Sequence, residues 1–425
     1  MNAKFHILTL ALLLANASWA QDATSVRDSL YNLAGTATVD EPLNMTGLIV
    51  NPNYDGDNRE GWEGTGATAV TWGTWEHWNH PFDNWQNLGT DLPDGIYELN
   101  ASALHRVGNY WDPWYSSGTF TDLSRRTAVL YGKSGGIDLC APVMDLASCA
   151  TYEPASAYGT AQLANGMYIP DNPESFYFYT QSGYYGENST YIAVTDGHLT
   201  IGYRDPAYIE GQWSIVDNWQ LYYLGNSDEA YALVKEQQTA LIQNLSQLFA
   251  KESLLNDYAD ATERFRNASQ NAEILASYSL MDSLRTALRS NAEAYHQYKE
   301  KQEFLLKQLL ENEIYGEYRN ILEDYLTEYE EPNETYLRGT AYYILDTRTL
   351  DTPDILEEMA FMEELYKTAV EKGIGNGTNI TYMLQNADFS QSNFQGWETS
   401  RTNSGNFYSR NLCHQDRQRE YQKSI

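Results

Sequence analysis

The sequence predicts a protein of several domains: an antiparallel β-sandwich, then an α-helical bundle or stalk, then the start of a second β-sandwich. Three observations lead to this fold class. Tryptophan and glycine are concentrated before residue 225, apolar residues recur with helical spacing from there to residue 373, and a phrase from the first region returns after the helices. With 425 residues, the chain is long enough for two or three domains.

Residues 1–20 have the pattern of a secretory signal peptide. Lys4 supplies a positive charge, an apolar run covers residues 7–15, and Ser-Trp-Ala at residues 18–20 forms a small-x-small cleavage site. We expect cleavage after Ala20, and therefore a protein that is secreted or held at the cell surface. No later stretch approaches the roughly 20 apolar residues of a membrane span, so we expect no membrane span.

Residues 21–225 have the alternation of half-buried β-strands. Apolar and polar side chains alternate over residues 95–104, and again in two runs joined by Asp196-Gly197, a dipeptide suited to a two-residue hairpin turn. Alternation in a later run places six side chains on one face: Trp213, Ile215, Asp217, Trp219, Leu221 and Tyr223. Several strands with Gly, Pro and Asn between them and no helical period predict an antiparallel β-sandwich.

Residues 226–375 are predicted to be helical. Four apolar residues recur every seven positions, as a packed helical seam requires: Val234, Leu241, Leu248 and Leu255. Another helix is predicted to follow Thr352 as N-cap, with Pro353 at its first position and Gly373 just past its end. These patterns predict a bundle or stalk that spaces other modules. The short, interrupted heptads leave the oligomeric state open.

The phrase NPNYDGDNREGW at residues 51–62 recurs as NADFSQSNFQGW at residues 386–397 without a gap. The residues Asn51, Asn58, Gly61 and Trp62 have identical equivalents in the second copy. We therefore expect a second β-sandwich module in residues 376–425. Those residues are too few for a whole copy, and the last of them have no strand pattern, so we expect the chain to be truncated or frame-shifted there.

Residues 44–225 resemble the galactose-binding-like sandwiches found as carbohydrate-binding modules in exported bacterial proteins. The resemblance is carried by NPNYDGDNREGW, LPDGIYELNASALHR, YYGENSTYIAVTDGHLTIGY and WSIVDNWQLYYLG. The order of sandwich, helices and sandwich also resembles modular surface proteins of gut and oral Bacteroidetes. The resemblance implies a jelly roll that is non-catalytic, binds glycans through loop aromatics and sometimes carries a structural calcium.

Two aromatic clusters are candidate sugar-binding surfaces. Trp72 and Trp75 lie in WGTWEHWNHPFDNW, and Tyr110, Trp111 and Trp114 lie in GNYWDPWYSSG. An aromatic face suits the apolar C–H patch of a pyranose ring, and flanking polar groups bind its hydroxyls. Two such polar groups are Asp112 and Arg106.

Most other tryptophans have a plainer interpretation. Trp62, Trp213 and Trp219 lie on segments with strand patterning, where large apolar side chains are usually buried. We expect these three to belong to the core. For Trp111 and Trp114, which are separated by Asp-Pro in a turn-rich stretch, core burial and exposure at a ligand site both stay open.

Three aspartates are candidate metal ligands, which makes a structural calcium the one cofactor considered. Alternation predicts a buried Asp217 carboxylate, which is costly unless it ligates a metal or ties down a loop through backbone N–H groups. Asp55 and Asp57 surround a glycine in DGDN, as in calcium loops. The second copy has Ser390 and Ser392 in their places, so a turn is the favoured role for DGDN.

The net charge of −31 excludes nucleic acid as a partner, because the chain could not neutralise phosphates. No Gly-x-Ser-x-Gly elbow or complete phosphate loop occurs, and we expect no enzyme activity. The leading hypothesis is an exported, non-catalytic protein that binds a polysaccharide or glycan with loop aromatics. The alternatives are a truncated accessory part of a glycan-degrading enzyme and a structural surface or adhesion protein with no sugar ligand.

Overall fold

The structure, a computed structural model, describes residues 23–65, 70–109, 127–143, 159–162, 166–186, 188–311, 314 and 316–373. The predicted signal peptide and the predicted second module lie outside these residues. So do four of the candidate ligand contacts: Tyr110, Trp111, Asp112 and Trp114.

The chain divides into two compact units. The first comprises Met1–Asn244 and Tyr258–Leu284, and the second comprises Leu245–Asp257 and Arg285–Ile425. The change from strands to helices falls near residue 225, where the composition changes. Part of the helical region after residue 225 nevertheless belongs to the first unit, so a boundary at residue 225 marks the end of the strands and does not separate the two compact units.

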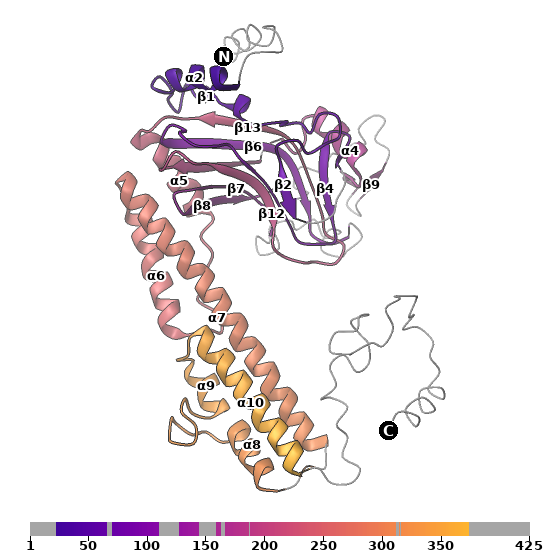
Figure 1. Cartoon of the computed structure of the whole chain (residues 1–425), viewed down its shortest axis with the longest axis vertical. Coiled ribbons are helices and arrows are strands. Elements are labelled where there is room, and N and C mark those ends of the chain that lie inside the picture. The colour runs from indigo at the N-terminus through magenta and orange to yellow at the C-terminus, as the bar shows by residue number, and fades with distance from the viewer. Residues whose placement is uncertain are drawn as a thin grey trace. The chain divides into compact units, whose positions relative to one another are not determined.

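Eleven strands of the described chain make up two sheets in the first unit (Figure 1). Their bounds are β1 Leu43–Asn44, β2 Glu63–Thr65, β3 Val70–Thr71, β4 Thr74–Trp78, β5 Phe82–Asn87, β6 Gly95–Arg106, β7 Val129–Ser134, β8 Ile137–Pro142, β11 Asn188–Val194, β12 Thr200–Asp205 and β13 Trp213–Tyr223. A separate two-stranded hairpin is formed by β9 Thr160–Gln162 and β10 Tyr168–Pro170.

The six-stranded sheet has the order β11-β6-β13-β4-β3, with β1 beside β13, and the five-stranded sheet has the order β2-β5-β12-β7-β8. Each pairing in the two sheets is antiparallel. The antiparallel β architecture predicted for this region is therefore confirmed. The jelly-roll topology stays a prediction.

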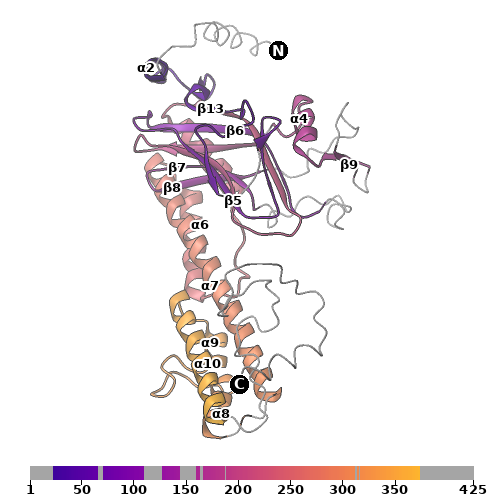
Figure 2. The same cartoon turned by 45° about the vertical axis from the view of Figure 1, so that its right-hand side comes forward.

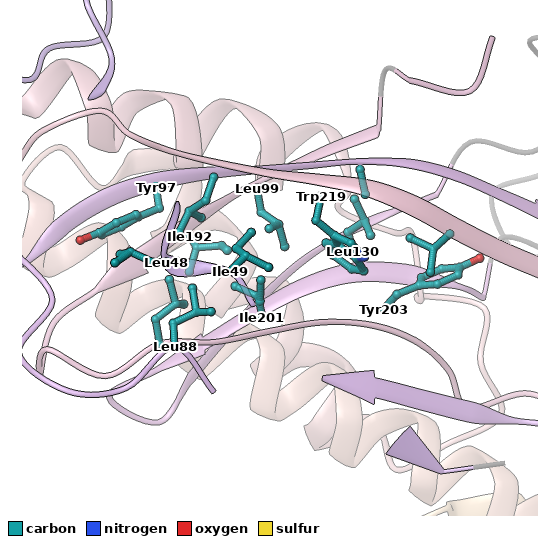
Figure 3. Packing of buried hydrophobic residues seen from close by; sticks show 14 of the residues in the cluster. Leu48, Ile49, Leu88, Tyr97, Leu99, Leu130, Ile192, Ile201, Tyr203 and Trp219 are labelled. Carbon is teal, nitrogen blue, oxygen red and sulfur yellow. The ribbon is translucent and has the colours of Figure 1, made fainter. Parts of the chain in front are cut away.

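A core of aliphatic and aromatic side chains fills the space between the two sheets (Figure 3). Leu99 and Trp219 come from the six-stranded sheet, and Leu130, Ile201 and Tyr203 come from the five-stranded sheet. All five are almost completely buried. Burial of such a side chain contributes about 1.5–3 kcal/mol, so this layer holds the two sheets together.

A β-bulge in β13 shifts the alternation of its side chains. Asp217 pairs with Ser102 and Gln220 with Asn100, so β13 has one residue more than β6 between these two pairs. An extra residue moves every later side chain to the opposite face. Asn218, inside the bulge, has a φ of +53°.

The predicted single face of β13 is therefore wrong. Trp213 and Ile215 belong to a cluster on the outer face of the six-stranded sheet, whereas Val216 and Trp219 belong to the core between the sheets. Asp217 lies before the shift, on the outer face, and is only partly buried. The separate prediction that Trp62, Trp213 and Trp219 are buried is confirmed.

The predicted hairpin at Asp196-Gly197 is a connection between the two sheets. β11 pairs with β6 in the six-stranded sheet, whereas β12 pairs with β5 and β7 in the five-stranded sheet. Gly197 has the expected positive φ, +73°. The turn is anchored by Asp196, whose Oδ1 accepts from Ser134 Oγ at 2.9 Å and from His198 N at 3.1 Å. Alternation identified both strands correctly but carried no information about their partners.

Helices of the described chain are α2 Ala23–Ala34, α4 Pro173–Gln181, α5 Asp228–Ala240, α6 Glu252–Asn267, α7 Asn271–Glu311, α8 Glu317–Thr327, α9 Ala341–Thr347 and α10 Thr352–Gly373; a 3₁₀ turn, η1, covers Thr46–Leu48. The predicted helix from Thr352 to Gly373 is confirmed. The predicted heptad seam is not continuous, because α5 ends at Ala240 and α6 begins at Glu252.

Helix α5 covers an edge of each sheet. Gln237 Oε1 accepts from the backbone N of Tyr191 at 3.0 Å and Gln237 Nε2 donates to the backbone O of Ser189 at 3.1 Å, both on edge strand β11. Gln238 Nε2 donates to the backbone O of Cys140 on edge strand β8 at 3.0 Å. Unpaired edge groups invite association with other strands, and these glutamines occupy them.

The second unit is a helical bundle with a tyrosine-rich core. Tyr298 on α7 and Tyr325 on α8 are buried, and their hydroxyl oxygens are 2.9 Å apart. Tyr325 OH donates to Glu358 Oε2 on α10 at 2.7 Å, and Arg338 pairs with the other Glu358 oxygen at 3.3 Å. The network satisfies the polar atoms that three helices bury together.

The repeated phrase folds into a turn built from the residues that are identical in both copies. Asn51 has a φ of +49°, and its Nδ2 donates to the backbone O of Asn58 at 3.2 Å. Trp62 is buried, and its Nε1 donates to the backbone O of Asn51 at 3.2 Å. Gly61 has a φ of +79° and lies against Val50. The repeated positions therefore have a folding role.

Replacing Gly61 with alanine is expected to lower the free energy of unfolding by about 2–5 kcal/mol. A left-handed backbone costs an alanine about 1–2 kcal/mol. The new Cβ would also lie 2.6 Å from Val50 Cβ, and such overpacking costs about 1–3 kcal/mol. Urea unfolding followed by circular dichroism measures the loss.

Gly136→Ala is the matched control, because Gly136 has nearly the same φ, +78°, and no atom within 4 Å of the position of an added Cβ. Gly136→Ala should lose only the free energy that a left-handed backbone costs an alanine, about 1–2 kcal/mol. Equal losses in the two variants would contradict the packing role given to Gly61.

Candidate functional site

A groove of about 590 Å³ lies on the outer face of the six-stranded sheet, beside the bulge in β13. We call it the Trp72 groove. Its lining comes from the loop of the repeated phrase, the β3–β4 turn, α4, and the paired residues of β6 and β13: Asn53, Asp55, Gly56, Asp57, Trp72, Gly73, Ser102, Tyr177, Thr180, Gln181, Asp217 and Asn218.

Trp72 occupies a turn position that a large side chain rarely takes. Thr71 and Thr74 pair across a two-residue turn, and both central residues have positive φ, +56° for Trp72 and +65° for Gly73. Such type I′ turns normally carry Asn-Gly. A left-handed backbone costs a bulky residue about 1–2 kcal/mol, and Trp72 is nevertheless 48% exposed. Full burial of the Trp72 ring therefore does not offset the strain of its backbone. Backbone strain of this kind is typical of ligand sites.

Neighbouring residues hold the Trp72 turn in place. Gly73 N donates to Asp57 Oδ1 at 2.8 Å, which ties the turn to the loop of the repeated phrase. On the other side, the Trp72 ring lies 6.1 Å from the Tyr177 ring and 6.3 Å from the Phe178 ring, measured between centroids. The exposed ring is therefore fixed in position before any ligand arrives.

Helix α4 contributes Tyr177, Thr180 and Gln181 to the lining. It lies next to β9 in both views (Figure 1 and Figure 2). Its start is fixed by Asn172, whose side chain accepts from Ser175 N in a capping box, and by Pro173 in the first turn. Phe176 and Tyr179 are buried in the cluster on the outer face of the sheet. Tyr177, one position along, lies on the groove side.

The described lining of the groove carries negative charge without a basic counterpart. Burial, the main cause, and the negative charge of Asp55 raise the pKa of Asp217, against the hydrogen bond from Asn218 N, to about 7. That bond, from Asn218 N to Asp217 Oδ1, is 2.6 Å long. Among the residues that the structure describes, no Lys, Arg or His lines the groove. In the described residues, no group of three or more His, Cys, Asp or Glu could hold a metal ion.

The structure brings together four of the predicted site residues: Trp72, Asp55, Asp57 and Asp217 all line the Trp72 groove. Sequence reasoning had placed the tryptophan and the aspartates in separate sites. It missed Tyr177 and Asn218, which join them there. Tyr177 lies on a helix and Asn218 lies in a β-bulge, and no sequence pattern indicates that the two residues share a site.

Trp75 and Arg106 need correction. Trp75 is fully buried and packs edge-on against Tyr54, with ring centroids 5.8 Å apart, so its face cannot stack on a sugar. Arg106 is only 5% exposed; its guanidinium pairs with Asp171 and lies 5.5 Å from the centre of the Trp213 ring. Both side chains are part of the packed structure. Tyr110, Trp111, Asp112 and Trp114 lie outside the described residues.

A serine, a histidine and an aspartate also meet inside the sandwich. Ser214 Oγ lies 2.8 Å from His105 Nδ1, and His105 Nε2 lies 3.6 Å from Asp205 Oδ2. These residue types form catalytic triads elsewhere. Here all three are buried, and burial lowers the pKa of His105 to about 3, so its ring is neutral. No substrate can reach the serine, and we assign the group a structural role.

No protein-family model and no curated protein matches the chain. Among solved structures, the chain is similar to TmCBM61 in complex with β-1,4-galactotriose, at 13% sequence identity and a TM-score of 0.23; the similarity covers 41% of this chain and 96% of that chain. At this identity and TM-score, the similarity carries no argument about a ligand. In the described part of the chain, no helix is long and apolar enough to span a membrane.

Proposed function

We propose that the first unit is a non-catalytic glycan-binding module, and that the Trp72 groove is its binding site. The observation that carries the proposal is a half-exposed tryptophan, held in a strained turn at the wall of a groove whose other residues are mainly polar. An exposed, pre-positioned aromatic ring suits the apolar face of a pyranose. The polar neighbours suit its hydroxyls.

The hydrogen-bonding groups of the groove match a sugar better than an apolar ligand. Asp55 and Asp217 supply carboxylate acceptors, while Asn53, Asn218 and Gln181 supply amides that both donate and accept. Sugar hydroxyls donate and accept in the same way. A ligand that covers Asp217 would have to satisfy its carboxyl group, since an unsatisfied buried polar group costs about 1–3 kcal/mol.

The rest of the proposal follows from the sequence. A signal peptide at residues 1–20 would export the protein to the place where polysaccharides are met. The helical residues would space this module from the second one predicted in residues 376–425. Trp111 and Trp114 stay a second candidate contact surface, which the experiment below includes.

Trp72→Asn is expected to weaken glycan binding by at least about tenfold, or about 1.4 kcal/mol, while leaving the fold nearly unchanged. The variant removes the stacking face. It also converts the turn to Asn-Gly, the favoured type I′ pair, and this relief of strain offsets the missing packing of the ring against Tyr177 and Phe178. A glycan array with the full chain finds the ligand, and calorimetric titration gives the affinity.

Trp78→Ala is the matched control, because Trp78 is 61% exposed on the same sheet but does not line the groove. It should bind as the unchanged chain does. Loss of binding in Trp78→Ala, or in Trp111→Ala with Trp114→Ala, but not in Trp72→Asn would move the site elsewhere. No binding to any plant, host or microbial polysaccharide would overturn the proposal and favour a structural surface protein.

A further inference from the structure

A second groove continues the first along the outer face of the sheet. It has a volume of about 200 Å³, and we call it the Glu98 groove. Its lining includes Glu98 and Asn100 of β6, Ser189 of β11 and Gln220 of β13. Two residues, Ser102 and Asn218, line both grooves. The two hollows therefore adjoin at a shared wall.

The floor of the Glu98 groove is a straight row of side chains on β6. Glu98, Asn100 and Ser102 alternate onto the outer face, and at about 3.4 Å per residue the row is about 14 Å long. Asn100 pairs with Ser189 on one side and with Gln220 on the other, which makes a polar rung across three strands. This floor alone is longer than one sugar ring.

A chain of hydrogen bonds along β13 links the two grooves. Tyr222 OH donates to Gln220 Oε1 at 2.9 Å, Gln220 Nε2 donates to Asn218 Oδ1 at 3.5 Å, and Asn218 Nδ2 donates to Ser102 Oγ at 3.4 Å. At the far end, Glu98 pairs with Tyr191 on β11 and with Tyr222 on β13. Aromatic side chains therefore stand at both ends of a polar floor.

The charge of the combined lining has one sign. Asp55, Asp57, Asp217 and Glu98 contribute carboxyl groups, and among the described residues neither lining contains a Lys, Arg or His. Burial raises the pKa of Glu98 and of Asp217, which favours their neutral forms, so the charge that repels anions comes chiefly from Asp55 and Asp57. A ligand with its own carboxylates or sulfates would be repelled there, and no cation in the lining would attract it.

We propose that the two grooves form one track for an uncharged, linear oligosaccharide of several sugar units, with the Trp72 groove at one end and Tyr191 and Tyr222 beyond the other. The inference rests on the proposed function and adds the ligand class to it. Each further unit that reaches the Glu98 groove meets new polar contacts, so affinity rises with chain length until the track is full.

Calorimetric titration of the full chain with β-1,4-linked galacto-, gluco-, manno- and xylo-oligosaccharides, from dimer to hexamer, tests the track. We expect at least one series to bind with an affinity that rises about tenfold or more between dimer and hexamer. Oligomannuronates of the same lengths, the β-1,4-linked acidic counterparts of the manno series, should bind at least about tenfold more weakly than the neutral series.

Three variants distinguish the contribution of the Glu98 groove from that of the Trp72 groove. Trp72→Asn should weaken every length, whereas Gln220→Ala should reduce the gain between dimer and hexamer, and Trp78→Ala should change neither. Equal affinity for dimer and hexamer, or no effect of Gln220→Ala on that gain, would overturn the track and leave the proposed function standing. Oligomannuronates that bind as well as the neutral chains would overturn the charge selection. No binding by any of these series would overturn the track, and the glycan array then decides whether the glycan-binding function falls with it.

Discussion

Replacing Trp219 with alanine is expected to lower the free energy of unfolding by about 3–5 kcal/mol, the usual cost of removing a buried tryptophan. Trp219 is 1% exposed and its ring centroid lies 4.7 Å from that of Trp62. Its Nε1 donates to Tyr54 OH at 2.9 Å, and its backbone N donates to the backbone O of Pro52 at 2.9 Å. One residue of β13 thus ties the turn of the repeated phrase to the sheet. Chemical unfolding followed by circular dichroism measures the loss.

Two further variants make this result specific. Trp219→Phe keeps a large ring but removes the Nε1 donor, and Tyr54 OH loses that partner, so we expect an intermediate loss of about 1–3 kcal/mol. Trp78→Ala removes an exposed tryptophan from β4 and should cost less than about 1 kcal/mol. If Trp219→Ala lowered the free energy of unfolding no more than Trp78→Ala does, this result would contradict the burial of Trp219 in the core that follows from the bulge in β13.

The stability of the protein is expected to fall as pH rises from about 4 to about 7, because of Asp217. Its pKa is about 7 in the fold and 3.8 for an ordinary aspartate, so over this range the folded chain binds more protons than the unfolded chain. A shift of that size corresponds to about 4 kcal/mol. Since the side chain is partly exposed, we expect about 1–2 kcal/mol from it.

Asp217→Asn isolates this contribution. The variant should be more stable than the unchanged chain above pH 7, and the difference should shrink toward pH 4 in unfolding curves measured across that range. Asp55→Asn removes a neighbouring negative charge and should move the midpoint of the dependence to lower pH without abolishing it. A pH dependence that Asp217→Asn leaves unchanged would show that the Asp217 carboxyl is not the group that titrates.

Local patterns were enough to predict much of the fold. Alternation over residues 95–104 identified β6, and capping residues identified α10 at both ends. The recurrence of Asn51, Gly61 and Trp62 pointed to a folding role that the turn now explains. These features are set by residues close in sequence, whose local preferences agree with the final structure.

The arrangement of the strands could not be predicted in the same way. One inserted residue at the bulge in β13 reverses the faces of Trp219, Leu221 and Tyr223, and nothing in their spacing records it. The turn at Asp196-Gly197 has a dipeptide typical of hairpin turns, but it connects one sheet to the other. Strand pairing depends on tertiary packing, which the dipeptide does not record.

The candidate site depends most on tertiary structure. Trp72 and Trp75 are close in sequence, yet the first is at the tip of a turn and the second is in the core. Asp217 meets Asp55 only because β13 passes beside the loop of the repeated phrase. Tyr177 joins them from a helix. Residue types suggested a sugar site and an acidic site, and the fold makes them one groove.

Oxidative footprinting with and without the glycan tests most directly the claim that the glycan binds in the Trp72 groove. Trp72 and Trp78 are both exposed on one sheet, but only Trp72 lines the groove. The full chain is oxidised by hydroxyl radicals, and mass spectrometry of its peptides gives the rate at each aromatic residue. We expect the bound glycan to slow oxidation of Trp72 and Tyr177 and to leave that of Trp78 unchanged. Protection of Trp78, or of Trp111 and Trp114, with Trp72 unprotected would contradict a binding site in the Trp72 groove.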